Sequence, residues 1–68
     1  MVDKNKLRAA WVAKGFTQSD VAQKIGVSEA TFSRRMQQGR FDSDEIETLV
    51  ALLEINDIAD IFFANLVT

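Results

Sequence analysis

Residues 17–35, TQSDVAQKIGVSEATFSRR, constrain the fold more than any other stretch, because two short helical patterns meet there at one glycine. Thr17 supplies an N-cap hydroxyl for the first pattern, and Asp20 follows three residues later, as in a capping box. Gly26 ends that helix, since glycine adopts the left-handed conformation without a side-chain clash. Ser28 is placed to cap the second pattern. The stretch therefore predicts two short helices joined by a tight turn.

The apolar residues around this glycine predict how the two helices pack. Ala22 is small enough for the following helix to cross closely above it, and Val27 and Phe32 fill the angle from inside. Phe32 and Met36 lie four residues apart and so face the same side of the second helix. An ordinary helical hairpin with no binding role is the alternative interpretation.

The rest of the chain has helical periodicity as well. It contains no proline and three glycines, one of which, Gly15, ends a first helix that begins at Asp3 or Asn5. Two later segments have polar caps at Asp42 or Ser43 and at Asn56 or Asp57. Their apolar residues at helical spacing are Ile46, Leu49, Val50 and Leu53, and then Ile58, Ile61 and Phe62.

These patterns predict an all-α fold, a compact bundle of five short helices. We expect one domain over residues 1–68, with the two-helix unit at about 17–38 and the carboxyl-terminal helices at about 43–66. A chain of 68 residues buries only roughly 60% of the surface that it exposes when unfolded, so its stability alone is marginal and self-association would help to stabilise it.

Composition excludes several function classes. The chain has no Cys and no His, so we expect no disulfide, no metal site and no cofactor. It has no Tyr either, and no nucleophile–base pair that an enzyme would need. The amino end is too charged for a signal peptide, and no apolar run approaches the roughly 18 residues of a membrane span. We therefore expect a cytoplasmic, soluble protein without enzymatic activity and with no evident small-molecule ligand.

The net charge of −2 conceals two halves of opposite sign. Residues 1–40 carry eight basic and three acidic side chains, a net charge of +5. Residues 41–68 carry seven acidic side chains and no basic one, a net charge of −7. Either half is interpretable as an ordinary solvated surface, but the basic half contains the two-helix unit, which favours a polyanionic partner for it.

The stretch GFTQSDVAQKIGVSEATFSR resembles the helix-turn-helix of the Cro/cI-type (XRE-like) repressors of phages and bacteria. The shared run is T-Q-x-x-V-A-x-x-I-G-V-S-x-x-T-F-S-R, and with the first and fourth helices the similarity covers most of the chain. It implies a lambda-repressor-like DNA-binding domain in a bacterial host cell. The carboxyl-terminal part is similar to that of small Cro-like phage proteins.

Geometry and resemblance agree on the DNA-facing residues. With Phe32 and Met36 inward, the remaining face of the second helix points outward, and capped helix ends favour phosphate near Gln18 and Ser28. The resemblance implies that base edges are read by Glu29, Ala30, Ser33 and Arg34. It implies that phosphates are bound by Gln18 and Ser28, with Thr17, Thr31, Gln37 and Arg40 as further phosphate contacts.

Some of these residues have a second interpretation. Arg34 can donate two hydrogen bonds to guanine, and Ala30 can touch a thymine methyl group. Glu29 can accept from cytosine, or it can serve as an acid favoured by the helix dipole. Ser33 can simply be solvated. Arg35 either reaches phosphate or pairs with an acid of the fourth helix.

The chain departs from the family pattern in two ways. Many relatives pair an arginine late in the first helix with a glutamate late in the third, where this chain has Trp11 and Met36. An apolar contact replaces such an ion pair without its desolvation cost. Gly39 lies one residue later than usual, which predicts a slightly longer third helix.

The last apolar residues predict self-association. Phe63, Leu66 and Val67 form a second stripe, which we expect at the interface of a homodimer. A two-fold dimer places two recognition helices about 34 Å apart on a palindromic operator. A tail folded onto its own core is the alternative.

The function that follows is sequence-specific binding of double-stranded DNA. The resemblance implies a Cro-type phage repressor that acts by covering a promoter. The alternative is a small helical protein-interaction module, an anti-repressor or a partner of polymerase or repressor.

Overall fold

A computed structural model of the chain describes residues 1–63. It contains five helices: α1 (Lys4–Ala13), α2 (Gln18–Ile25), α3 (Glu29–Gln38), α4 (Ser43–Leu53) and α5 (Ile58–Phe62). Those residues form no β-strand, so the predicted all-α bundle of five short helices is confirmed. No helix among them is long and apolar enough to cross a membrane.

The helix starts follow the predicted capping residues. The Asp3 side chain accepts a hydrogen bond from the Lys6 amide at 3.1 Å. Thr17 and Asp20 form the complete capping box, with each side chain bonded to the other residue's backbone N–H. Ser28 accepts from the Thr31 amide at 3.1 Å. These local bonds occupy backbone N–H groups that a helix leaves without an internal partner.

The fifth helix differs from its prediction. It ends at Phe62 rather than near residue 66, and only Phe62 is buried. The prediction that Ile58 shares its inner stripe is wrong, because 41% of Ile58 is exposed. A helix of five residues makes little more than one turn, so residues four apart need not both reach the core.

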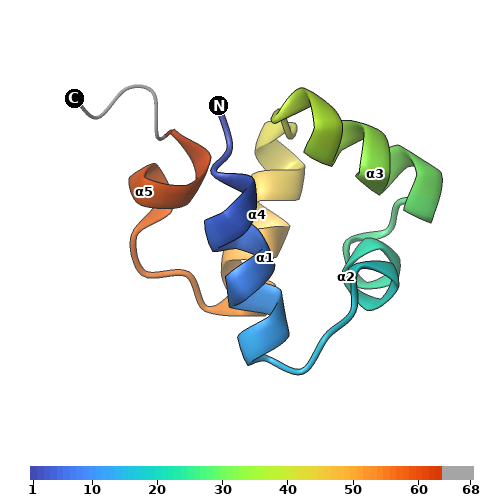
Figure 1. Cartoon of the computed structure of the whole chain (residues 1–68), viewed down its shortest axis with the longest axis horizontal. Coiled ribbons are helices and arrows are strands. Elements are labelled where there is room, and N and C mark those ends of the chain that lie inside the picture. Colours follow the sequence, from blue (N-terminus) through green and yellow to red (C-terminus); the bar gives the residue numbers. More distant parts are fainter. Residues whose placement is uncertain (64–68) are drawn as a thin grey trace.

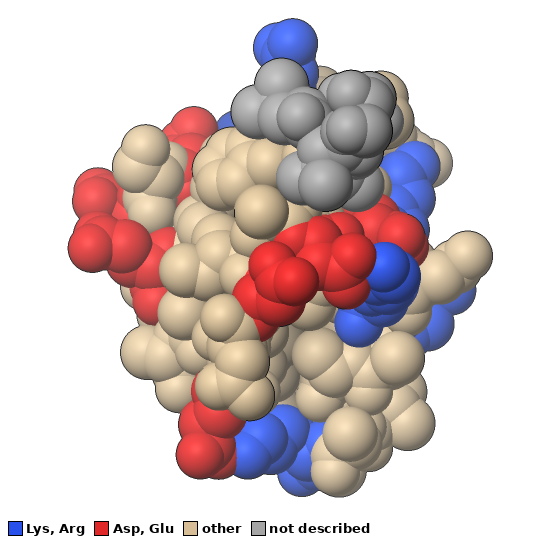
Figure 2. Space-filling model, turned by 90° about the vertical axis from the view of Figure 1, so that its left-hand side faces the viewer, with Lys and Arg blue, Asp and Glu red and all other residues tan. Residues whose placement is uncertain are grey.

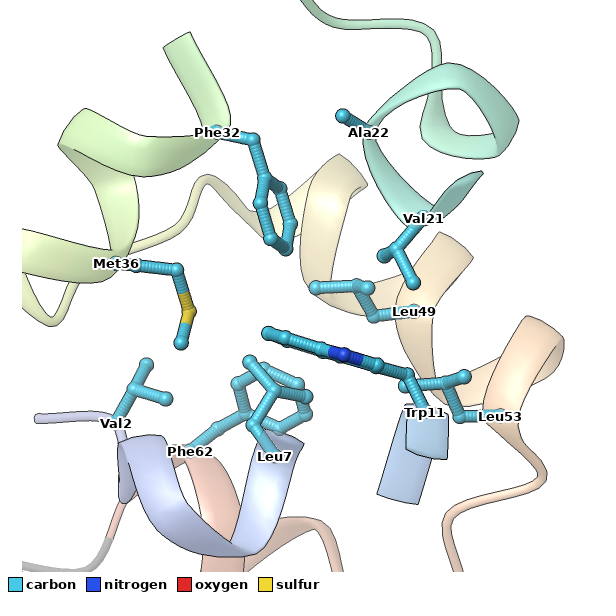
Figure 3. Close-up of a cluster of buried hydrophobic side chains, with 10 residues drawn as sticks. All are labelled: Val2, Leu7, Trp11, Val21, Ala22, Phe32, Met36, Leu49, Leu53 and Phe62. Carbon is cyan, nitrogen blue, oxygen red and sulfur yellow. The ribbon is translucent and has the colours of Figure 1, made fainter. Parts of the chain in front are cut away.

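Ten buried residues form one core between the helices (Figure 3): Val2, Leu7, Trp11, Val21, Ala22, Phe32, Met36, Leu49, Leu53 and Phe62. Phe32 is fully buried. Its ring meets Trp11 edge-on with centroids 5.6 Å apart, and it lies 5.5 Å from Phe41. Phe41 in turn meets Phe62 at 6.4 Å. This row of rings joins α1, α3 and α5.

The helices α2 and α3 lie on one side of the molecule and α5 on the other, with α1 and α4 between them (Figure 1). The first residues connect the two sides. The Val2 amide donates to the Gly39 carbonyl at 2.9 Å, and the Asp3 amide donates to the Ile61 carbonyl at 2.6 Å. Val2 itself is buried in the core. The end of α3 is therefore tied to α5 through the amino-terminal segment.

Candidate nucleic-acid interface

The angle between α2 and α3 is set at Gly26. This residue has a φ of 84°, in the left-handed region, and its N–H closes the last turn of α2. The next amide, of Val27, donates to the Ala22 carbonyl at 3.0 Å. Ala22 and Phe32 are both buried where the helices meet. The crossing is thus held by backbone geometry and by the core, as the sequence predicts.

The exposed face of α3 carries the predicted base-reading residues. Phe32 and Met36 point into the core (Figure 3), and Glu29, Ala30, Ser33, Arg34 and Gln37 are all exposed. Their outward orientation is therefore confirmed. The Arg34 side chain makes no hydrogen bond or ion pair with any of residues 1–63, so within that part its five N–H donors face solvent.

Gln18 and Ser33 come together although they belong to different helices. The Gln18 Nε2 donates a hydrogen bond to the Ser33 Oγ at 2.9 Å. An amide nitrogen carries two hydrogens, so one donor of Gln18 is left for another acceptor. The bond fixes the direction of the predicted phosphate anchor relative to a predicted base reader.

The hydroxyl groups of Thr17, Ser28 and Thr31 differ in the hydrogen bonds that they make within the protein. Thr17 Oγ1 accepts from the Asp20 amide. Ser28 Oγ accepts from the Thr31 amide and donates to Thr31 Oγ1 at 2.8 Å. Ser28 therefore has its hydrogen engaged within the protein, whereas Thr31 keeps one to donate. This arrangement favours Thr31 over Ser28 as a side-chain donor to phosphate.

The contacts of Arg35 decide between its two interpretations, because its partners are acids at the start of α4. Its Nη2 lies 3.3 Å from Asp42 Oδ2, and its Nε lies 3.3 Å from Glu45 Oε1. The Glu45 carboxylate also accepts from the Asp42 amide at 2.9 Å, at the start of α4. Arg35 thus joins the end of α3 to the first turn of α4, while Arg40 beyond it is exposed.

Trp11 and Met36 are both buried in the core, where the family pattern has an ion pair. The helix α3 ends at Gln38, and Gly39 has a φ of 69°. The later glycine thus extends α3 as predicted.

Two basic residues of α1 were not among the predicted site residues. Lys4 and Arg8 line a hollow of about 300 Å³ with Gln18, Ser33, Met36 and Gln37. The Lys4 Nζ donates to the Gln37 carbonyl at 3.1 Å. Their i, i+4 spacing puts them on one face of α1, but the sequence does not say that this face borders α3.

Several acidic side chains lie on the side of the molecule that carries α5. The view onto that side (Figure 2) shows a mostly uncharged surface with separate groups of Asp and Glu, and with some Lys and Arg beside them. Lys6 pairs with Asp60 at 2.6 Å, and Lys14 pairs with Glu54. Phe63 is 39% exposed there. The other two predicted interface residues, Leu66 and Val67, lie outside the described residues.

Three ionisable groups within residues 1–63 have shifted pKa values. The hydrogen bonds from Thr17 hold the pKa of Asp20 below its ordinary value. The hydrogen bond with Lys14 lowers the pKa of Glu54, and the hydrogen bond with Asp60 raises that of Lys6. Along residues 1–63 no cluster of acidic side chains is arranged to hold a metal ion.

A comparison with protein families supports the nucleic-acid interpretation of the α2–α3 unit. Residues 12–54, more than half of the chain, match the antitoxin Xre-like helix-turn-helix domain. No curated protein and no solved structure matches the chain. The match covers α2, α3 and α4 and the end of α1, so it includes the whole exposed face described above. The chain belongs to the Xre-like helix-turn-helix family of DNA-binding regulators.

Proposed function

We propose that the chain is a Cro-type transcriptional repressor, which inserts the exposed face of α3 into the major groove of its operator. The observation that carries the proposal is the position of Arg34. Its guanidinium is free of partners within residues 1–63 and stands beside Ser33 on the helix face opposite the buried Phe32. A rigid helix with one free arginine and small polar neighbours is suited to reading base edges.

The exposed residues of α3 each contact a base edge in this proposal. Arg34 donates to O6 and N7 of guanine, and Ala30 contacts a thymine methyl group. Glu29 accepts from the cytosine amino group, and it also favours the start of α3 through the helix dipole. Ser33 reads a base edge while its oxygen holds the amide of Gln18.

The phosphate contacts flank this face. Gln18 lies at the first position of α2, where free backbone N–H groups and the helix dipole attract an anion. Its second amide hydrogen supplies a side-chain donor to the same phosphate. The remaining phosphate contacts are Thr17, Ser28, Thr31, Gln37 and Arg40. They orient the protein on the duplex without reading its sequence.

The repressor is a homodimer in this proposal. Phe63 is exposed at the end of α5, and with Leu66 and Val67 it forms the contact with a second copy. A two-fold dimer presents two α3 helices about 34 Å apart, which matches adjacent major grooves on one face of a palindromic operator. Covering a promoter in this way blocks polymerase, and this mode of repression needs no catalytic group.

Footprinting on the DNA that adjoins the gene tests the proposal directly. We expect protection of two half-sites, with centres about 10 base pairs apart and with inverted symmetry. Protection of one isolated half-site would contradict the dimer but not the use of α3. Absence of any protected site at protein concentrations that saturate random DNA would contradict sequence-specific repression.

A second candidate is a protein-interaction module, and the family's description as an antitoxin domain favours it. In this function the acidic side around α5 binds a protein partner, with Ile58 and Phe63 as its exposed apolar residues. The product of a neighbouring gene is the partner to examine. Cells that make this product are grown with and without the chain. An antitoxin would restore growth that the product inhibits, whereas a repressor without an antitoxin role would not.

A further inference from the structure

The hollow between α1, α2 and α3 has the composition of an anion site. It has a volume of about 300 Å³, and its six lining residues include two cations and no acid. The cations are Lys4 and Arg8 from α1. Gln18, Ser33 and Gln37 supply polar groups from the other two helices. The hollow therefore borders the base-reading face, with which it shares Ser33.

The basic residues of α1 and its C-cap residue, Lys14, fall into two groups with different surroundings. Lys6 and Lys14 are paired with Asp60 and Glu54 on the acidic side of the molecule. Arg8 is exposed and has no acidic partner within residues 1–63. Two of these four charges are thus offset by acids of the protein, whereas the charge of Arg8 is not.

Lys4 is held in place beside the hollow. Its ammonium donates to the Gln37 carbonyl in the last turn of α3, where the carbonyl ends of a helix attract a cation. An ammonium group has three hydrogens, so two remain for an external acceptor. On the opposite wall, the second amide hydrogen of Gln18 is also available.

We propose that this hollow binds one phosphate of the DNA backbone, with Arg8 as its principal ligand and Lys4 as the second. The inference rests on the proposed function, since it places this phosphate next to the groove that α3 reads. Arg8 donates in a fixed fork that matches phosphate oxygens, and Lys4 adds a point charge. The contact positions the protein on the duplex and carries no sequence information.

The variant Arg8→Gln tests the assignment, with Lys6→Gln as the matched control on the same helix. Both variants lose one positive charge from an exposed side chain, so circular dichroism should show both folded. Fluorescence anisotropy measures the affinity for operator and for random duplex DNA from 50 to 300 mM salt. We expect Arg8→Gln to reduce the slope of log K against log salt by about 0.9, the value for one phosphate. Lys6→Gln should keep the wild-type slope.

Ethylation interference locates the phosphate. In wild type, ethylation of one phosphate per half-site beside the α3 groove should block binding, and in Arg8→Gln the same ethylation should no longer matter. Replacing chloride by inorganic phosphate at constant ionic strength should change the DNA affinity less than twofold. Strong competition by inorganic phosphate would overturn the backbone assignment in favour of a free anion.

The remaining outcomes separate the two proposals. If Arg8→Gln keeps the wild-type slope and interference pattern while Arg34→Ala loses base preference, the hollow is not a phosphate site and the proposed function stands. If the affinity of wild type for DNA does not fall as the salt concentration rises, or if wild type does not bind DNA, both proposals are overturned.

Discussion

Replacing Phe32 by leucine tests whether the row of aromatic rings holds α3 at its angle. Phe32 is fully buried and contacts Trp11 and Phe41, with centroids 5.6 and 5.5 Å away. An aromatic pair is worth about 0.5–1.5 kcal/mol beyond the area that it buries, so two pairs amount to about 1–3 kcal/mol. A domain of 68 residues has a total free energy of unfolding of about 3–10 kcal/mol.

We therefore expect Phe32→Leu to lower Tm by roughly 5–20 °C, since 1 kcal/mol corresponds to about 4–8 °C in a domain of this size. Phe16→Leu is the matched control. Phe16 is half-buried at the edge of the core and is covered by Lys24, whose Nζ lies 5.2 Å from the ring centroid. Loss of the Phe16 ring should lower the free energy of unfolding by less than about 1 kcal/mol.

Thermal unfolding followed by circular dichroism at pH 7 compares the two variants. If both variants lower Tm equally, or if Phe32→Leu changes it by less than about 2 °C, the aromatic contacts of Phe32 do not hold α3 in place.

Three further predictions concern the site, the capping box and the interface. Arg34→Ala should leave Tm unchanged and reduce discrimination at one base pair by about 5- to 150-fold, the equivalent of 1–3 kcal/mol. The measurement is binding to operators in which each base pair is replaced in turn. A loss of discrimination spread over all positions would contradict the assignment of Arg34 to one base pair. The pKa of Asp20 is lower in the folded protein than in the unfolded chain, so its stabilising effect is complete above its ordinary pKa and is lost as the pH falls through the lowered value. Asp20→Asn should therefore show a smaller fall in Tm between pH 7 and pH 3 than wild type; an equal fall would show that other groups cause it. Phe63→Asp should convert the dimer to a monomer in sedimentation, while Val12→Asp, at a residue that is 61% exposed on α1, should not. An unaltered dimer mass for Phe63→Asp would place the interface elsewhere.

The helix caps and the buried faces were predictable because they depend on nearby residues. Thr17 and Asp20 are three positions apart, and their reciprocal bonds form within one turn. Phe32 and Met36 lie on one face by helical period alone, and both are buried. The same period determines which side of α3 is exposed, so the outward orientation of Arg34 also followed from the sequence.

The remaining features depend on how helices pack across the chain. The sequence could not decide between phosphate and Asp42 as the partner of Arg35, because this depends on where α4 begins relative to α3. The bond from Lys4 to Gln37 joins residues on α1 and α3 that no local pattern relates. Ile58 was misassigned because a helix of one turn gives too few residues to define its inner face.

The bond between the Asp3 amide and the Ile61 carbonyl also has a consequence for synthesis. Its partners are about 60 residues apart, nearly the whole described chain. At about 5–20 residues per second, the ribosome makes the acceptor roughly 3–12 s after the donor. The Asp3 amide therefore lacks this partner while the helices between Asp3 and Ile61 are made. The bond can form only after α5 has emerged, so Asp3 reaches its final position late although it is made before every helix.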